Sequence, residues 1–425
     1  MNLLNSTALG SYAEHITLFI LIQILTILIF SRIVSFFGKK FLGQTNVAGE
    51  ILAGILLGPS LLATLFPDIF NTIFIDDTSV AFIGFSQIGL IFLMFQIGME
   101  FDFNRQLKGQ GSAFMLISVA GIVIPFLLGF VSAPYFWATL PEPRPDILGF
   151  RLFFAISMSI TAIPILGRIF MELDYSNTRI ASIIISAAAV DDVIGWLLLG
   201  SITALVTASF NAYIMVGKIF ILVLFALIIY FLGSRVLSSF INKFSDRSEE
   251  INSITMFYVV LGLLSSAIIT SYIGVYAIIG GFIFGLSLHK NRNFVYAWNS
   301  SVGRFINIFF LPLFFVYTGL KTNIGLLSNL QDIMICFLIC FLAFIGKFGG
   351  TYLTSRFVSI NHKDALIIGF SMNTRALMEL IVLNVGYDLG LLPPKIFTML
   401  VIMAVGSTFM ITPVLKILLK KTQSK

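Results

Sequence analysis

The sequence predicts an all-α polytopic membrane protein with about thirteen transmembrane helices. Of its 425 residues, 58% are hydrophobic and only 11% are charged, which leaves too little polar surface to cover a soluble protein of this size. Apolar stretches of about 20 residues, the length that crosses a bilayer as a helix, recur along the chain with short polar breaks. Barrel strands would alternate apolar and polar residues, and these stretches do not.

Each predicted span is an apolar run bounded by polar or glycine-containing punctuation. In chain order the spans cover residues 16–37, 47–66, 79–99, 111–138, 148–171, 180–205, 211–239, 251–271, 273–288, 302–320, 330–356, 363–387 and 396–419. In SYIGVYAIIG, Gly274 either separates two spans or bends one long span. We treat it as the boundary between the eighth and the ninth.

Positive charges are distributed unevenly between the two sets of loops. With the N-terminus outside, the inner loops hold Lys39, Lys40, Arg105, Lys108, Arg179, Lys243, Arg247, Lys290, Arg292, Arg356, Lys363, Lys420 and Lys421. The outer loops hold mainly Arg144, Lys321 and Lys395. Because Lys and Arg accumulate on the cytoplasmic side, we expect an odd number of spans in the cytoplasmic membrane, with the C-terminus inside. These loops account for the net charge of +6, and no basic run long enough to bind nucleic acid is present.

The spans leave no room for a second domain, so we expect one membrane transport domain over residues 1–425 without a soluble regulatory domain. The first residues, MNLLNSTALGSYAEH, lack the basic region and cleavage site of a signal peptide and are treated as mature sequence. Cys336 and Cys340 lie in one apolar run, and we interpret them as helix-packing residues rather than a disulfide or a metal site.

Two spans share a polar pattern at their centre. The fifth contains AISMSITAIPILGR and the twelfth contains GFSMNTRALMEL, and the two enter the membrane from opposite sides. This predicts inverted repeats, approximately 47–205 and 273–419, with two discontinuous helices that cross where helix ends and freed backbone groups bind ions. Pro164 would interrupt the first helix, whereas the second has no proline. The alternative is two continuous helices whose hydroxyl groups bond to their own backbone.

The stretch AAAVDDVIGWLLL places Asp191 and Asp192 inside the sixth span. An aspartate at the centre of a bilayer costs roughly 2.5 to 3.5 kcal/mol on insertion scales, so such residues usually line a wet cavity and mark an ion or proton path. Adjacent residues on a helix point about 100° apart, which gives the two carboxyl groups different partners. The alternative is a structural pair held by hydrogen bonds.

Lys347, in CFLAFIGKFGGTYL, is the expected partner of Asp191 because it lies near the centre of the eleventh span. Gly346, Gly349 and Gly350 around it allow a neighbouring helix to approach closely. The pair would keep one carboxylate ionised. Snorkelling of the lysine towards the interface is the alternative, and the central position of Lys347 disfavours it.

A carboxylate that binds either a proton or a cation, and that opens to each side in turn, produces antiport. Oxygen ligands suit Na⁺ or K⁺, and the hydroxyl groups of Ser157, Ser159 and Thr161 are expected beside the Asp192 carboxylate. Asp192 is therefore the predicted monovalent-cation ligand.

Glu379 and Glu50 are further acidic residues inside predicted spans. Arg375 and Glu379 are four residues apart, so they would share one helix face and neutralise each other. We favour a structural brace over direct ion binding for this pair. Glu50 lies near the start of the second span, where an interfacial or packing role is expected.

An intramembrane enzyme is the alternative from a different class. An aspartyl protease would carry Tyr-Asp and Gly-x-Gly-Asp; Tyr387-Asp388 is at a span edge, and Gly-x-Gly-Asp is absent from the sequence. A prenyl-transfer enzyme would use Asp-Asp-x-x-Asp to hold magnesium, and DDVIG ends in Gly195. The histidines, which a metal-dependent hydrolase would need, all fall at span ends: His15, His289 and His362. We predict that the chain is not an enzyme and has no cofactor.

Together these residues resemble the monovalent cation:proton antiporters, in the branch with Kef-type transporters, bacterial sodium/proton antiporters and plant cation/proton exchangers. The similar segments are VAGEILAGILLGPSLL, GLIFLMFQIGMEFD, FFLPLFFVYTGLKTN and MNTRALMELIVLNVG, with ITP at 411–413. The resemblance implies a thirteen-helix fold with a core domain and a dimerisation domain, which works in the lipid membrane as a homodimer by an elevator-like motion.

By position, the resemblance implies that Asp192 binds the cation or proton, that Asp191 pairs with Lys347, and that Thr161 lies in the broken helix beside the site. An Asp-Asp pair with this lysine tends to accompany electrogenic exchange in the superfamily. Kef systems often have Gln at the first position and a nucleotide-binding domain, so Asp191 argues against ligand-gated potassium efflux. We expect exchange of Na⁺, with K⁺ or Li⁺ as alternatives, for protons; the second hypothesis is a Kef-type potassium efflux transporter or channel.

Overall fold

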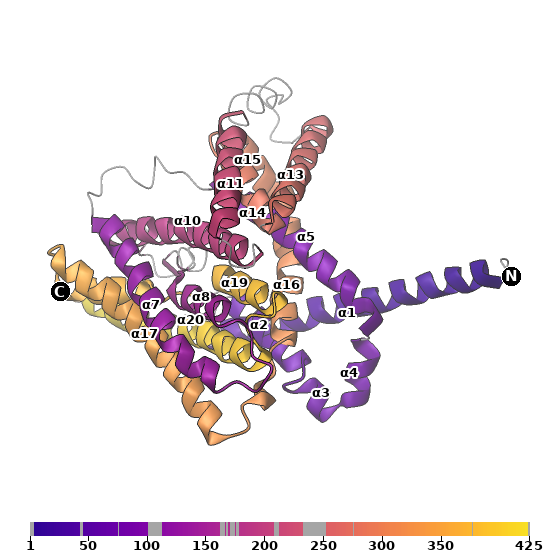
Figure 1. The fold of residues 1–425 in the computed structure, drawn as a ribbon, viewed down its shortest axis with the longest axis horizontal. Coiled ribbons are helices and arrows are strands. Elements are labelled where there is room, and N and C mark those ends of the chain that lie inside the picture. Colours follow the sequence, from indigo (N-terminus) through magenta and orange to yellow (C-terminus); the bar gives the residue numbers. More distant parts are fainter. Residues whose placement is uncertain are drawn as a thin grey trace. The chain divides into compact units, whose positions relative to one another are not determined.

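A computed structural model shows a protein built from helices (Figure 1). It describes residues 4–42, 46–74, 76–100, 113–161, 166, 169–170, 175, 178–207, 212–232, 252–274, 276–375 and 377–423, and every regular element among them is helical. Within these residues, eight helices are long and apolar enough to cross a membrane, and four shorter helices are apolar. The all-helical, multi-span class predicted from composition is therefore confirmed.

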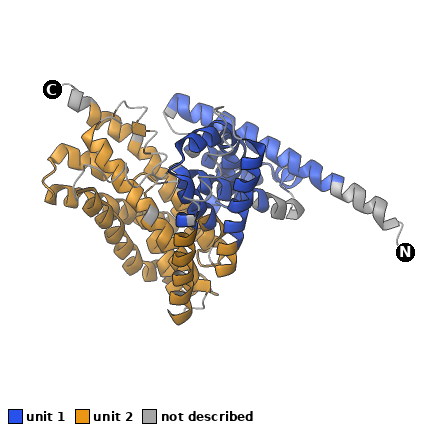
Figure 2. Cartoon of the chain, turned by 90° about the horizontal axis from the view of Figure 1, so that it is seen from above, with its two compact units in different colours: residues 1–100, 229–268, 280–325 blue, residues 101–228, 269–279, 326–425 orange. Residues whose placement is uncertain are grey.

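The described residues divide into two compact units, coloured blue and orange in Figure 2. The first unit comprises residues 1–100, 229–268 and 280–325, and the second comprises residues 101–228, 269–279 and 326–425. Each unit is assembled from segments that are far apart in the sequence.

In the first unit, α1 (Leu4–Leu42), α2 (Asn46–Leu57), α5 (Asp76–Glu100) and α16 (Leu311–Leu320) pack together. Two short helices, α3 (Leu62–Leu65) and α4 (Pro67–Ile73), follow α2. The apolar core between α1, α2 and α16 is formed by Ile24, Ile27, Ala53, Leu57, Leu313 and Val316. The second predicted span, 47–66, is therefore two helices, because the chain turns at Gly58 to Leu61 instead of continuing straight.

Glycines set the closeness of α2 and α16. A Cβ on Gly54 would lie 2.2 Å from the Val316 carbonyl oxygen and 2.8 Å from the Gly319 Cα, and one on Gly319 would lie 2.5 Å from the Ile51 carbonyl oxygen. Small residues at such positions let two helix backbones touch, which is how helices associate in a membrane, where lipid removes most of the hydrophobic driving force.

Gly54→Ala is expected to destabilise the first unit by about 1–3 kcal/mol, because the new methyl group must push the two backbones apart. Thermal unfolding of the purified chain in detergent measures this as a lower melting temperature. The matched control is Gly84→Ala on α5, where an added Cβ would meet no atom within 4 Å. Equal melting temperatures for both variants would contradict the close-packing role of Gly54.

The rest of the first unit contains α13 (Ser253–Ile273), α14 (Ala277–Leu288) and α15 (Arg292–Trp298), of which α13 and α14 extend across the border between the units. Gly274, with φ of +89°, lies between α13 and α14, so it separates two helices as the predicted boundary required. Two π-helical turns, η2 (Asn299–Gly303) and η3 (Ile306–Phe310), precede α16, so the predicted span 302–320 is not one regular helix.

The second unit contains α7 (Ala113–Ala138), α8 (Ile147–Ser159), α10 (Arg179–Thr207), α11 (Ala212–Leu232), α17 (Leu330–Phe357), α18 (His362–Ser371), α19 (Leu377–Asp388) and α20 (Pro394–Gln423). The border between the units crosses α11 near its end. Helix α7 packs against α8, α10 and α17, and α17 packs against α18 and α20 (Figure 1). This arrangement surrounds the ends of α8, α18 and α19 with longer helices.

Both spans with the shared polar pattern are interrupted. Helix α8 ends at Ser159 and Ile160 is extended, while Pro164, the residue expected to break this helix, lies outside the described residues. In the twelfth span, α18 ends at Ser371 and α19 begins at Leu377 although no proline intervenes. The amide of Asn373 and the hydroxyl of Thr374 donate to the carbonyls of Gly369 and Ser371, which gives the backbone an alternative to helical hydrogen bonds.

An arginine positions α8 against α7. Pro134 lies inside α7 and has no N–H group, so the carbonyl of Phe130 lacks its usual partner one turn later. Arg151 of α8 donates from Nε to this carbonyl at 3.1 Å, and its guanidinium group lies 3.9 Å from the centre of the Phe130 ring. The same side chain thus satisfies the backbone and joins the two helices.

Candidate functional site

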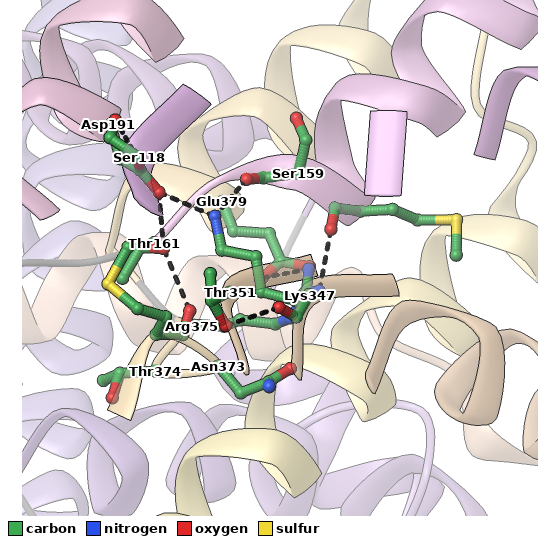
Figure 3. A network of polar contacts seen from close by, with 12 residues as sticks. Ser118, Ser159, Thr161, Asp191, Lys347, Thr351, Asn373, Thr374, Arg375 and Glu379 are labelled. Carbon is green, nitrogen blue, oxygen red and sulfur yellow. Dashed lines mark hydrogen bonds and ion pairs between the residues drawn. The ribbon is translucent and has the colours of Figure 1, made fainter. Parts of the chain in front are cut away.

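The centre of the second unit is a buried polar network around Asp191 of α10 (Figure 3). The side chain of Asp191 is fully buried and accepts three hydrogen bonds. Ser118 of α7 donates to Oδ1 at 2.6 Å, and Thr161 and Lys347 donate to Oδ2 at 2.8 and 2.7 Å. Both oxygens of this carboxylate are therefore occupied by protein donors.

Lys347 of α17 connects three helices. It is fully buried, and besides the ion pair with Asp191 it donates from Nζ to the carbonyl of Ser159, the last residue of α8. Gly121 of α7 lets α17 approach closely beside this lysine, because a Cβ there would lie 2.8 Å from Cγ2 of Thr351, one turn after Lys347. The lysine lies at the site, inside the protein, and does not snorkel.

Arg375 lies in the break between α18 and α19 and is also fully buried. Its Nη1 donates to the Ser157 carbonyl at 2.9 Å, and its Nη2 donates to the carbonyls of Met158 at 2.8 Å and Ala343 at 3.2 Å. The last carbonyls of a helix have no partner within the helix and carry partial negative charge. Arg375 and Lys347 together supply two positive charges at this end of α8.

Asp192 follows Asp191 on α10 and is 6% exposed. It also interacts electrostatically with Lys347. Neighbouring residues on a helix point in different directions, so the two carboxyl groups have different surroundings. Lys347 therefore interacts electrostatically with both carboxyl groups, but its direct ion pair is with Asp191.

The hydroxyl groups expected beside Asp192 donate to other acceptors in this structure, and their role as cation ligands stays a prediction. Thr161 is bonded to Asp191, and the hydroxyls of Ser157 and Ser159 donate to the carbonyls of Phe154 and Ile156 in their own helix. A serine in a helix has the carbonyl three residues earlier within reach, and in α8 this local bond forms for both serines. The contribution of these serines to the network is made instead by their carbonyls, which bind Arg375 and Lys347.

Thr161 connects the two interrupted spans. Its Oγ1 lies 2.8 Å from Asp191 Oδ2 and 2.9 Å from the carbonyl oxygen of Met372, the first residue after α18. A hydroxyl group has one hydrogen to donate, so these two acceptors compete for it. The backbone of the second break is thus directly linked to the carboxyl group at the first.

Arg375 and Glu379 form the predicted ion pair, with Nη1 and Oε2 3.6 Å apart and both side chains buried. The expectation that both lie on one helix face is wrong, because Arg375 precedes α19 and only Glu379 is in its first turn. The carbonyls at the end of α8, which have no partner within the helix, accept hydrogen bonds from the guanidinium group. The Glu379 carboxylate therefore lies at a longer distance from it.

Ser118 was not predicted, although a signal existed. It lies in an apolar span with Gly121 three residues later and Pro125 seven residues later, and all three are buried. Residues at this spacing lie on one face of a helix. A stripe of small and hydroxyl residues on such a face is typical of close contact with another helix in a membrane.

A buried aspartate paired with a buried lysine, beside a second buried aspartate and interrupted helices in a chain of apolar spans, is typical of secondary ion transporters. The transmembrane sodium/hydrogen exchanger family matches residues 18–421, and the chain belongs to this family. This confirms the antiporter superfamily predicted from the motifs.

Among its relatives, the Na(+)/H(+) antiporter NhaS4 of Synechocystis is 35% identical over 397 residues, which cover 93% of this chain and 96% of that protein. Cation/H(+) antiporter 17 of Arabidopsis thaliana is 34% identical, covering 97% of this chain and 50% of its own length. The chain thus spans about half of the plant protein. A structure of the sodium proton antiporter MjNhaP1 from Methanocaldococcus jannaschii has a TM-score of 0.65 at 17% identity, with 96% of each chain covered, which supports the fold.

Proposed function

We propose that this chain is a secondary antiporter that exchanges a monovalent cation for protons across a membrane. The observation that carries the proposal is the buried carboxyl pair beside Lys347, in a chain that belongs to the sodium/hydrogen exchanger family. Intramembrane carboxyl groups of this kind mark ion and proton paths. The relatives named as Na(+)/H(+), cation/H(+) and K(+)/H(+) antiporters support the same activity.

The two acids have separate roles in this proposal. Asp191 is the anchor, since three donors already occupy its oxygens and one of them is the ammonium group of Lys347. Asp192 is the exchange site, where a cation and a proton compete for one carboxylate. Competition at one group is enough to couple the two fluxes when the site opens to each side in turn.

The cation is proposed to be Na⁺, with K⁺ or Li⁺ as alternatives. A relative from Enterococcus hirae, 27% identical over 397 residues, is named an Na(+)/H(+) antiporter, and one from yeast, 30% identical over 380 residues, is named a K(+)/H(+) antiporter. The Asp-Asp pair with Lys347 supports Na⁺ and electrogenic exchange in this proposal.

The proposed architecture has thirteen spans in the cytoplasmic membrane, with the N-terminus outside and the C-terminus inside. Its inverted repeats are 47–205 and 273–419, and it works in lipid as a homodimer with an elevator-like motion. The two interrupted spans, in which α8 ends at Ser159 and α18 ends at Ser371, support the repeats. The uneven distribution of Lys and Arg supports the orientation.

Reconstitution of the purified chain into liposomes with a pH-sensitive dye inside tests the function. With an acidic interior, external Na⁺ is expected to raise the internal pH, whereas choline is not. Comparison of Na⁺, K⁺ and Li⁺ at equal concentrations identifies the cation. Cation flux without proton movement would favour the Kef-type efflux alternative, and no flux of either ion would overturn transport and leave the intramembrane enzyme.

A further inference from the structure

Glu379 is a buried carboxyl group with an unusual environment for an ionised acid. It is 1% exposed, and none of the described residues donates a hydrogen bond to either of its oxygens. The Nη1 atom of Arg375 lies 3.6 Å from Oε2, which is an ion-pair distance but not a hydrogen bond. Asp191 in the same network accepts three hydrogen bonds.

The charge of Arg375 is shared with other acceptors. Its two terminal nitrogens donate to the carbonyls of Ser157, Met158 and Ala343, and two of these lie at the partly negative end of α8. The guanidinium group is thus held by backbone oxygens and reaches Glu379 only at the longer distance. An ionised carboxyl group away from water needs hydrogen bonds to replace those it loses, and a proton removes that need.

The charges of the network give the second argument. Among the residues that the structure describes, it holds three carboxyl groups, Asp191, Asp192 and Glu379, and two cations, Lys347 and Arg375, all nearly or fully buried. With every group ionised, the network has one excess negative charge. A proton on Glu379 removes the excess, and so does a proton or a monovalent cation at Asp192. A proton on Glu379 and a cation at Asp192 can therefore replace each other.

We propose that Glu379 is a second proton-binding group of the transporter, which holds a proton while the cation site is empty and releases it to water when a cation binds at Asp192. The proton on Glu379 stands on the geometry alone, and its release by the cation rests on the proposed function. The cation contributes the positive charge that the departing proton removes, so the charge of the network is unchanged.

The other charged and titratable groups near Glu379 are few among the described residues. Lys347 and Cys340 of α17 interact with it electrostatically, and Asp191 and Asp192 lie beyond Lys347 on α10. Helices α8 and α20 also pack against α19. Arg151 of α8 donates to the Phe130 carbonyl, and Lys395 of α20 pairs with Asp332, so these two cations have other partners than Glu379. The protonation of Glu379 is therefore governed by Arg375 and by the exchange site.

Infrared difference spectroscopy of the purified full chain tests the proposal directly. The wild-type chain without a binding cation is expected to show the carbonyl stretch of a protonated carboxylic acid at neutral pH, and the band should be absent in Glu379→Gln, which keeps the size of the side chain. The matched control is Glu142→Gln, an exposed carboxyl group in the same unit. An unchanged band in Glu379→Gln would overturn the proton on Glu379.

The coupling is tested by adding Na⁺ or choline to the protein in weakly buffered solution with a pH indicator. Na⁺ is expected to remove the Glu379 band and to release one proton more per chain from wild-type protein than from Glu379→Gln. Equal release from both would overturn the coupling. Failure of antiport itself is read separately, from the wild-type dye assay in liposomes, and the infrared band in wild-type protein does not depend on any variant folding.

Discussion

Asp192→Asn is expected to abolish cation-driven proton flux in liposomes, by at least about 100-fold, because the amide can neither take up a proton nor bind a cation as an anion. The substitution keeps the size of the side chain and leaves the Asp191–Lys347 pair intact. We therefore expect the melting temperature of the purified variant to stay close to that of the wild type. The dye assay and thermal unfolding measure the two effects separately.

Substitution of the neighbouring residue, Asp191, provides the control for this prediction. Asp191→Asn removes the charge that pairs with Lys347, so it should lower the melting temperature, which Asp192→Asn should not. Wild-type flux in Asp192→Asn would contradict its role as the exchange site. Competition adds a pH signature: the Na⁺ concentration for half-maximal flux should rise by up to about tenfold for each unit of pH decrease, because protons then displace the cation.

The sequence reveals which buried groups must find partners, but seldom which partners they find. Asp191 and Lys347 were visible because a charge in an apolar run is costly, and oppositely charged residues in a membrane tend to meet. Their pairing required no knowledge of the helix positions. Most of the helix positions followed from apolar runs of the same kind, and the remaining differences lie where the chain breaks.

Backbone partners are not visible in the sequence, because every residue has the same carbonyl group. Two acceptors of Arg375, the carbonyls of Ser157 and Met158, are available only because α8 ends at Ser159. The break at 372–376 has no proline and is held by Asn373 and Thr374, which also occur inside regular helices. The hydrogen bonds of the Ser157 and Ser159 hydroxyls have the same origin, because a serine in a helix has a carbonyl of its own helix within reach.

Lys347→Met is expected to lower the free energy of unfolding by about 3–5 kcal/mol, because it leaves Asp191 buried without its counter-charge. It also removes the donor to the Ser159 carbonyl at the end of α8. Methionine keeps the length of the side chain, so the lost charge and hydrogen bonds dominate the effect. Thermal unfolding in detergent measures the loss.

Two comparisons separate the buried charge from other causes. The double variant Asp191→Asn with Lys347→Met should be more stable than Lys347→Met alone, since it no longer buries an unpaired charge. Lys395→Met breaks the pair with Asp332 in the same unit, where Lys395 is 32% exposed and Asp332 8%, so water partly replaces the lost charge and we expect a smaller loss than for Lys347→Met.

Lys347 also bears on the electrogenicity of exchange. If its ammonium group takes part in charge movement, the folded Lys347→Met variant should exchange ions at a rate that does not depend on membrane potential. In the liposome assay, a potassium gradient with valinomycin sets this potential. Unchanged voltage dependence together with an unchanged melting temperature would contradict both the pairing and the charge movement. A lower melting temperature with unchanged voltage dependence would leave Lys347 as a structural partner of Asp191. It would assign the second proton to another carboxyl group of the network, for which Glu379, which interacts electrostatically with Lys347, is the candidate.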